Sequence, residues 1–211
     1  MNQNVKIAKE LVKLAKSLVA EENVASEKGE YKNFTGWIYW RNVEGKVQNA
    51  DFKLLDGVDL QIIWKNGVWE YGKMIGADWE NGTWKDGTWS GNGDWRGGTW
   101  EDGTWEDGTW YGGVWKNGTW KNGAFWGGTW EDGTWHFGTW GIKGDNPIWK
   151  NGVWVNGNWE VGTWDNGIWC NGCWKRGAWN GGTWKKGSWY DGCDKEGHPH
   201  GPKDSPDKWQ K

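Results

Sequence analysis

Ordinary core-forming residues are scarce in this 211-residue chain. Only 36% of the residues are hydrophobic, and Leu, Ile and Val are too few for a conventional globular core. No run of 18 apolar residues exists, so no membrane span is expected. Lysines interrupt the apolar residues of the N-terminus, so secretion by a signal peptide is not expected. The net charge of −3, with both signs mixed, argues against direct nucleic-acid binding.

Tryptophan and glycine dominate instead, with 27 Trp and 37 Gly, and this aromatic content argues against simple disorder. From Trp64 to Trp189 the chain repeats every five residues. Trp occupies all but two of 25 repeat positions, where Met74 and Phe125 replace it. Gly lies two residues before the Trp position in 22 pentads, and Asn, Asp or Gly lies two residues after it in 19. The spacing slips at 89–95 and at 140–149, which predicts a loop or bulge at each place.

The pentad predicts a four-sided β-solenoid in which each pentad forms one side of a coil; its right-handed sense is implied only by the family resemblance described below. Strand neighbours point to opposite faces, so Trp and the Gly two residues before it should point inward. The Asn, Asp or Gly two residues after Trp should turn each corner, because these residues tolerate positive φ. This arrangement gives about six coils in a rod of roughly 30 Å. The core residues expected from this pattern include Trp100, Trp105, Trp110, Trp115, Trp120, Trp130, Trp135, Gly98, Gly103 and Gly108.

An antiparallel β-meander is the alternative, because Asn-Gly and Asp-Gly are strong hairpin signals. Trp79-Glu80-Asn81-Gly82-Thr83-Trp84 resembles designed tryptophan-zipper hairpins, and Trp115-Lys116-Asn117-Gly118 resembles a turn common in MORN repeats. Each strand would then be only about three residues long, and its Trp face would need a covering partner.

Three triplets resemble the Ala-(Asp/Asn)-Leu-x-Gly motif of pentapeptide-repeat proteins: Ala50-Asp51-Phe52, Val58-Asp59-Leu60 and Ala77-Asp78-Trp79. In the other pentads Gly replaces Ala, Thr replaces Asp and Trp replaces Leu, so the resemblance over residues 50–193 is otherwise one of pattern. The resemblance implies a β-solenoid in which the first and third residues of each triplet point inward. A Trp/Gly pentad array is also similar to repeat proteins of large tailed phages.

Residues 1–21 are expected to form an amphipathic helix, because Ile7, Leu11, Leu14 and Leu18 follow helical spacing. This helix is predicted to cap the rod or to dock on a protein partner; a membrane-surface role and a removable leader are the alternatives. The segment resembles short N-terminal helices of tailed-phage structural proteins, some of which are cleaved after Glu. Glu21 and Glu27 are the candidate positions, although neither has Leu or Ile two residues before it.

The remaining chain is divided by composition. Residues 22–49 are predicted to be a polar linker followed by a small hairpin between residues 37–40 and 43–47. Residues 50–193 form the pentad repeat. Residues 194–211 have almost no apolar content and are predicted to be a mobile tail.

The three cysteines offer two hypotheses beside that of surface thiols in a reducing compartment. The first is a zinc site built from Cys170, Cys173, Cys193, His198 and His200, although only one C-x-x-C is present. The second concerns Cys173 and Cys193, which lie 20 residues apart with no slip between them. In a four-sided coil these two thiols would stack in adjacent rungs, within disulfide range.

No catalytic constellation is present in the sequence. His136 has no Ser, Cys or Asp partner at a recognisable spacing. The carboxylate pairs Glu101-Asp102, Glu106-Asp107 and Glu131-Asp132 fall on outward repeat positions, where solvated charges are expected. We therefore predict a protein that is not an enzyme and uses no cofactor.

The function predicted from these observations is that of a structural or interaction protein, in a phage virion or the host cytoplasm, with a rigid rod as spacer or docking surface. The first alternative is a glycan-binding module, for which Trp126, Tyr111 and Tyr190 are the outward aromatic residues. The second alternative is a DNA-mimicking inhibitor, as some pentapeptide-repeat proteins are. Against mimicry, residues 64–189 hold 14 acidic and 12 basic residues, which is close to balance. The oligomeric state stays open.

Overall fold

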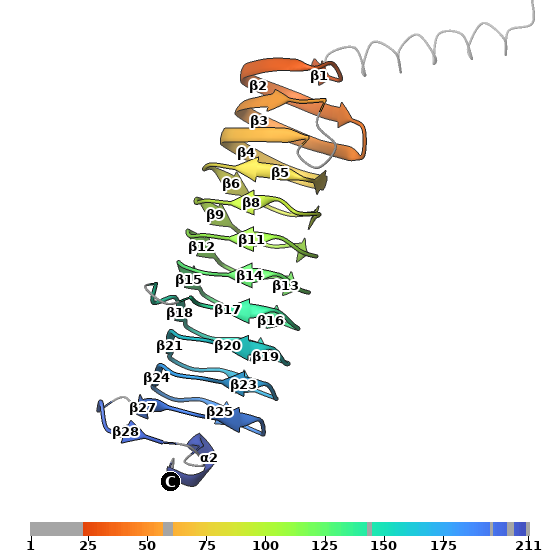
Figure 1. Cartoon of the computed structure of the whole chain (residues 1–211). Helices are drawn as coiled ribbons and strands as arrows, with labels where there is room; N and C mark the ends of the chain where they lie inside the picture. The colour runs from red at the N-terminus through yellow and green to blue at the C-terminus, as the bar shows by residue number, and fades with distance from the viewer. Residues whose placement is uncertain (1–22, 57–60, 143–144, 195, 202–204, 210–211) are drawn as a thin grey trace, which may run out of the picture.

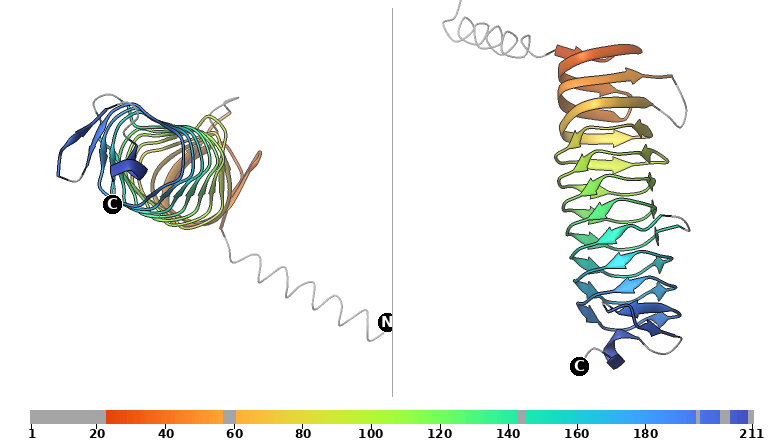
Figure 2. Two further views of the ribbon diagram at one scale, coloured as in Figure 1. Left: turned by 90° about the horizontal axis from the view of Figure 1, so that it is seen from below. Right: turned by 90° about the vertical axis from the view of Figure 1, so that its left-hand side faces the viewer.

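The chain winds into an elongated all-β solenoid (Figure 1). The computed structural model describes residues 23–56, 61–142, 145–194, 196–201 and 205–209. The helix predicted for residues 1–21 lies outside these residues. Viewed along its length, successive coils superpose on one closed outline (Figure 2). The predicted β-solenoid is therefore confirmed.

From Ala77 on, each pentad of the repeat forms one short strand that ends at or just after the inward Trp position. The strands are β5 (Ala77–Trp79), β6 (Thr83–Trp84), β7 (Thr88–Ser90), β8 (Asp94–Trp95), β9 (Thr99–Trp100), β10 (Thr104–Trp105), β11 (Thr109–Trp110), β12 (Val114–Trp115), β13 (Thr119–Trp120), β14 (Ala124–Phe125), β15 (Thr129–Trp130), β16 (Thr134–Trp135), β17 (Thr139–Trp140), β18 (Ile148–Trp149), β19 (Val153–Trp154), β20 (Asn158–Trp159), β21 (Thr163–Trp164), β22 (Ile168–Trp169), β23 (Cys173–Trp174), β24 (Ala178–Trp179), β25 (Thr183–Trp184) and β26 (Ser188–Trp189).

Three pentads, not four, complete one coil. Strand β10 pairs in parallel with β7 before it and with β13 after it, so that Trp105 lies in register with Trp89 and Trp120. The same three-strand step recurs along the repeat, and parallel pairing excludes the meander for this region. The predicted four sides and six coils were therefore wrong: 25 pentads make about eight coils, or a rod of roughly 40 Å at the usual strand spacing.

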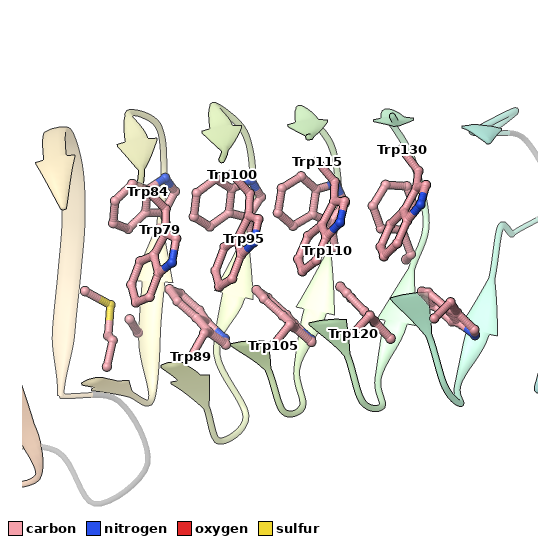
Figure 3. Packing of buried hydrophobic residues seen from close by; sticks show 14 of the residues in the cluster. Trp79, Trp84, Trp89, Trp95, Trp100, Trp105, Trp110, Trp115, Trp120 and Trp130 are labelled. Carbon is pink, nitrogen blue, oxygen red and sulfur yellow. The ribbon is translucent and has the colours of Figure 1, made fainter. Parts of the chain in front are cut away.

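Three columns of rings fill the interior of the rod. Figure 3 shows Trp84, Trp100, Trp115 and Trp130 in one column, with two further columns beside it. Trp100 and Trp115 stack with ring centroids 4.8 Å apart and planes 6° apart. Trp110 and Trp115, on adjacent sides of one coil, meet edge to face at 6.0 Å and 73°. Three indoles per coil therefore contact one another across the interior, so a fourth side is not needed to close the core.

Glycine, rather than Asn or Asp, carries the unusual backbone conformation at most corners of the repeat. Gly118 has a φ of 120°, and a Cβ placed on it would lie 2.4 Å from the carbonyl oxygen of Gly103 in the preceding coil. Among the described residues, positive φ outside glycine occurs only at Asn33, Arg41 and Asn49, all before the repeat. Our expectation that the Asn, Asp or Gly two residues after Trp supplies the positive φ was wrong for most pentads. The next residue, such as Gly118 after Asn117, supplies it, because close coil-to-coil contact admits no side chain there.

Both slips of the five-residue spacing fall between strands, in agreement with the loop or bulge predicted at each place. Across the first slip, Trp79 and Trp95 still stack at 4.6 Å and 9°. Across the second, Trp130 and Trp149 stack at 4.8 Å and 7°. The ring columns therefore continue past both slips.

Strand β4 (Ile62–Ile75) runs through one whole coil and starts the parallel repeat, pairing with β5, β6 and β7. On its other edge β4 pairs antiparallel with β3 (Val43–Leu54). Strand β3 pairs antiparallel with β2 (Gly29–Trp40), which pairs in parallel with β1 (Asn23–Ala25). We call strands β1 to β3 the N-terminal cap.

The N-terminal cap replaces much of the predicted linker. The segment 22–35 was expected to be a linker but contains β1 and the start of β2. The predicted hairpin is confirmed, since Trp37 lies opposite Lys46 and Trp40 opposite Val43, within a longer antiparallel pair. The motif Ala50-Asp51-Phe52 lies in antiparallel β3, so the parallel repeat begins later than residue 50.

The C-terminal tail also has structure where a mobile segment was expected. Strand β27 (Gly192–Asp194) continues the parallel sheet on β24 and pairs antiparallel with β28 (Pro199–His200). A short helix, α2 (Pro206–Trp209), follows and packs near β25. We call β27 and β28 the C-terminal hairpin.

Candidate functional site

The Trp and Gly residues predicted to carry the core do so. Trp100, Trp115 and Trp130 are fully buried, as are the other Trp residues named from the sequence. Gly98, Gly103 and Gly108 have φ values of 102°, 114° and 131° and contact the backbone of the preceding coil. These residues build the scaffold, so a functional surface has to lie on the sides or at the ends of the rod.

Several indole N–H groups in the C-terminal part of the rod donate hydrogen bonds in a regular pattern. Trp164 Nε1 donates to the carbonyl of Gly181 at 3.0 Å, and Trp169 and Trp174 donate in the same way to residues 17 positions ahead. Sixteen other indole nitrogens in the described residues are buried without a hydrogen-bond partner. Burying an unpaired N–H costs free energy, which the stacking and apolar burial of the rings must offset.

Outward charges alternate in sign along one side of the rod. This charge ladder contains Glu101, Lys116, Glu131 and Lys150, each on the residue after a stacked Trp. Lys116 pairs with Glu101 at 3.3 Å, and Lys150 with Glu131 at 3.1 Å. The carboxylates predicted as solvated surface charges are thus partly exposed ion-paired groups. Alternation of sign leaves no continuous acidic row on this side.

Two exposed aromatic clusters interrupt the polar surface. The first contains Tyr111 and Trp126, whose rings meet edge to face at 4.8 Å, with the Arg96 guanidinium 5.5 Å from the Tyr111 centroid. Tyr111 and Tyr190 are 37% and 53% exposed, and Trp126 is half-buried, so the outward placement predicted for all three is confirmed.

The second cluster lies where the N-terminal cap meets β4, and it was not predicted from the sequence. We call Trp37, Tyr39 and Tyr71 the aromatic patch. Trp37 stacks on Tyr39 at 5.6 Å and meets Tyr71 edge to face at 5.5 Å, and the Lys46 ammonium lies 5.9 Å from the Trp37 centroid. Tyr39 and Tyr71 are each 45% exposed. The sequence contained a signal for this patch: inward and outward side chains alternate in residues 37–40, and Trp and Tyr take the outward positions.

The structure separates the two cysteines that were predicted to stack. Cys173 lies in register with Asn158 and Ser188, whereas Cys193 lies in register with Ala178. The prediction was wrong because a coil holds 15 residues rather than 20, so the two thiols occupy different sides. All three thiols are free and partly buried.

Cys173 lines an open polar groove of about 410 Å³ together with Asn156, Asn158, Asn171 and Ser188. Burial raises the pKa of the Cys173 thiol; Lys175 opposes this rise and Glu160 adds to it. A raised pKa keeps the thiol protonated at neutral pH, which makes it a poor nucleophile.

The histidines predicted as zinc ligands both contact Asp194, and the group of close ligand atoms in the described residues contains no cysteine. His198 Nδ1 lies 3.1 Å and His200 Nε2 3.3 Å from the same carboxylate oxygen, Asp194 Oδ2. Asp194 Oδ1 accepts the backbone N–H groups of Glu196 and His198 at 3.1 and 2.8 Å. Desolvation alone would raise the pKa of Asp194, but hydrogen bonds from His198 and His200 outweigh it and lower the pKa to about 2.

His136, the third histidine of the chain, lies far from this group in the sequence. Its backbone N–H donates to the Trp120 carbonyl in the preceding coil.

Within the described residues no helix is long and apolar enough to cross a membrane. Comparisons with family models, with curated proteins and with solved structures find no match to this chain.

Proposed function

We propose that the protein is a non-enzymatic structural spacer, which holds partners at the two ends of a rigid rod at a fixed separation. The observation that supports this proposal is the continuity of the ring columns. Stacking passes both slips of the repeat without a break, at 4.6 Å between Trp79 and Trp95 and at 4.8 Å between Trp130 and Trp149. A rod whose interior has no discontinuity bends little, because close-packed interiors transmit strain.

The sides of the rod also suit a spacer. Its charge ladder pairs within the chain, as between Lys116 and Glu101, and so offers few unpaired charges to a partner. The ends differ from the charge-ladder side: the aromatic patch lies on the N-terminal cap and the adjoining β4, and the C-terminal hairpin carries the histidines. We therefore place the contacts with partners at the ends. Docking of a protein partner through the helix predicted for residues 1–21 stays a prediction, as does a place in a phage particle.

Length is the property that separates a spacer from a binding module. Deleting residues 101–115 removes one whole coil and joins Trp100 to Lys116, so each later Trp keeps its column. We expect the rod to shorten by about 4.8 Å and to remain folded. In the native assembly, cryo-electron microscopy should show the two attachment points closer by the same amount. An unchanged separation, or absence of the protein from purified particles, would contradict the spacer role.

A glycan-binding module is the second candidate, favoured by the exposed aromatic patch. Aromatic rings present an apolar face and, in Tyr and Trp, a polar group for hydrogen bonding. Trp37→Ala should abolish binding to a glycan array, with Tyr190→Ala as the control on a distant exposed ring. A wild-type protein that binds no glycan on the array would remove this candidate. DNA mimicry is not proposed, because the charge ladder alternates in sign.

A further inference from the structure

We propose that the C-terminal hairpin binds a divalent transition-metal ion of the Zn²⁺ type through His198 Nδ1, His200 Nε2 and Asp194 Oδ2. The proposal does not depend on the spacer function, because it rests on the geometry of this hairpin alone. It also differs from the cysteine-containing set expected from the sequence.

Two of the three donor pairs already have the separation that a metal ion requires. Zn²⁺ binds imidazole nitrogen and carboxylate oxygen at about 2.0–2.2 Å, so neighbouring ligands of a tetrahedron lie roughly 3.3–3.5 Å apart. The two imidazole nitrogens lie 3.1 and 3.3 Å from Asp194 Oδ2. An ion at Asp194 Oδ2 can therefore take either imidazole with shifts of a few tenths of an ångström, and a rotation of the exposed His198 ring would bring both imidazoles to the same ion.

Backbone N–H groups hold the Asp194 carboxylate in place through the oxygen that the imidazoles do not contact. Two backbone N–H groups, of Glu196 and His198, bind Asp194 Oδ1 and direct Oδ2 toward the imidazoles. Trp189 Nε1 donates to the His200 carbonyl at 3.2 Å, which ties β28 to the end of a ring column. Asp194 itself takes an inward repeat position, in register with Trp179. Support of this kind orients metal ligands and raises their affinity.

The donor set also indicates which ion is preferred. Imidazole ligands suit Zn²⁺, Ni²⁺ and Cu²⁺, whereas Ca²⁺ and Mg²⁺ require mainly oxygen ligands. A fourth ligand is within reach, since ligand atoms of Asp194, Glu196 and His198 all lie within 4.8 Å of one another. Cys193 precedes Asp194 in β27, and neighbouring strand residues point to opposite faces, so its thiol faces away from these donors.

The test is calorimetric titration of the EDTA-treated full-length protein with Zn²⁺. We expect one ion per chain, and binding at least about 100-fold weaker in the variant with both His198→Ala and His200→Ala. Asp194→Asn, which keeps the size of the side chain, should lose affinity to a similar degree. His136→Ala is the matched control, because it removes the one remaining histidine without touching the hairpin. Titration with Co²⁺ should give visible absorption bands of a nitrogen- and oxygen-ligated ion in the wild type.

Each contrary outcome has a clear meaning. Absence of Zn²⁺ binding by the wild type at micromolar concentrations overturns the proposal, as does equal affinity in the double His→Ala variant. Replacing all three cysteines by serine should leave the affinity unchanged, and loss of binding there would assign the ion to the thiols instead. Circular dichroism and the melting temperature of each variant without metal identify any failure to fold. If the double variant fails to fold, Asp194→Asn and Glu196→Gln take its place, and unchanged affinity in both overturns the proposal.

Discussion

The N-terminal cap and the Trp/Gly repeat build the same core with opposite chain directions. In the repeat, successive coils run parallel and each side is a two- or three-residue strand. In the cap, β2 and β3 are 12-residue antiparallel strands. One ring column nevertheless crosses the boundary: Phe52 of β3 stacks on Trp64 at 5.7 Å and 8°. Inward position, rather than strand direction, therefore determines which residues join the core.

The two regions turn their corners differently. The repeat uses glycine at positive φ, with the neighbouring coil in direct backbone contact, as at Gly113 against Gly98. The cap reaches positive φ at Asn33, Arg41 and Asn49, and its strands contain register shifts. A repeat that stacks identical corners has no room for side chains there, whereas the irregular cap has. Four changes test this contrast, in order of expected effect.

Removing one ring from a column should lower the free energy of unfolding more than any of the other changes. Trp115→Ala deletes a fully buried indole that stacks on Trp100 and Trp130 at 4.8 and 4.7 Å. We expect a loss of about 3–5 kcal/mol in the free energy of unfolding, and a similar loss for Phe52→Ala in the cap. Trp115→Phe should cost less than about 2 kcal/mol, because Phe125 already occupies such a position. Urea denaturation measures all three, and a negligible loss at Phe52 would mean that the column ends at the cap.

Adding a methyl group at one corner should lower the free energy of unfolding slightly less than removing a ring does. Gly113→Ala places a Cβ 2.4 Å from the Gly98 carbonyl oxygen at a φ of 105°, and we expect a loss of about 3 kcal/mol. The adjacent Gly112→Ala is the matched control, since its Cβ would lie 3.4 Å from the nearest atom, the Arg96 carbonyl oxygen. That variant should stay within about 0.5 kcal/mol of the wild type. Equal losses at both positions would disprove the backbone contact.

A disulfide tests the 15-residue coil. Ser188→Cys puts a thiol in register with Cys173, where parallel neighbours lie about 4.8 Å apart, within disulfide range. Oxidation should crosslink this pair and raise the free energy of unfolding by about 2–3 kcal/mol. The wild type should form no Cys173–Cys193 bond under the same conditions. Peptide mapping by mass spectrometry decides, and a native Cys173–Cys193 crosslink in folded protein would restore four sides.

Charge reversal in the ladder should have the smallest effect. Glu131→Lys places three lysines in succession with Lys116 and Lys150, and we expect a loss of about 0.5 kcal/mol at low salt. The loss should shrink in 0.5 M salt, because added ions screen exposed charges. Asp145→Lys, in the loop after Trp140, makes the same change of net charge outside the ladder and should be neutral. Thermal melts of both variants at two salt concentrations provide the comparison.

The sequence was sufficient to predict the solenoid, the inward Trp residues and a loop or bulge at each slip. It did not contain the number of sides, because a pentad looks the same whether three or four of them close a coil. The error in the Cys173–Cys193 distance follows directly from that ambiguity. The cap was underestimated because residues 22–35 are mostly polar. The meeting of His198, His200 and Asp194 depends on a hairpin that composition alone did not reveal.

The stacked indoles also determine how the rod transfers ultraviolet excitation energy after absorbing it. Rings 4.5–5 Å apart with nearly parallel planes, as in Trp159–Trp174 and Trp164–Trp179, exchange excitation energy far faster than they emit. The 23 Trp residues of the repeat therefore form one optical unit rather than 23 separate emitters. An acceptor dye attached at either end would collect ultraviolet excitation absorbed along the whole rod.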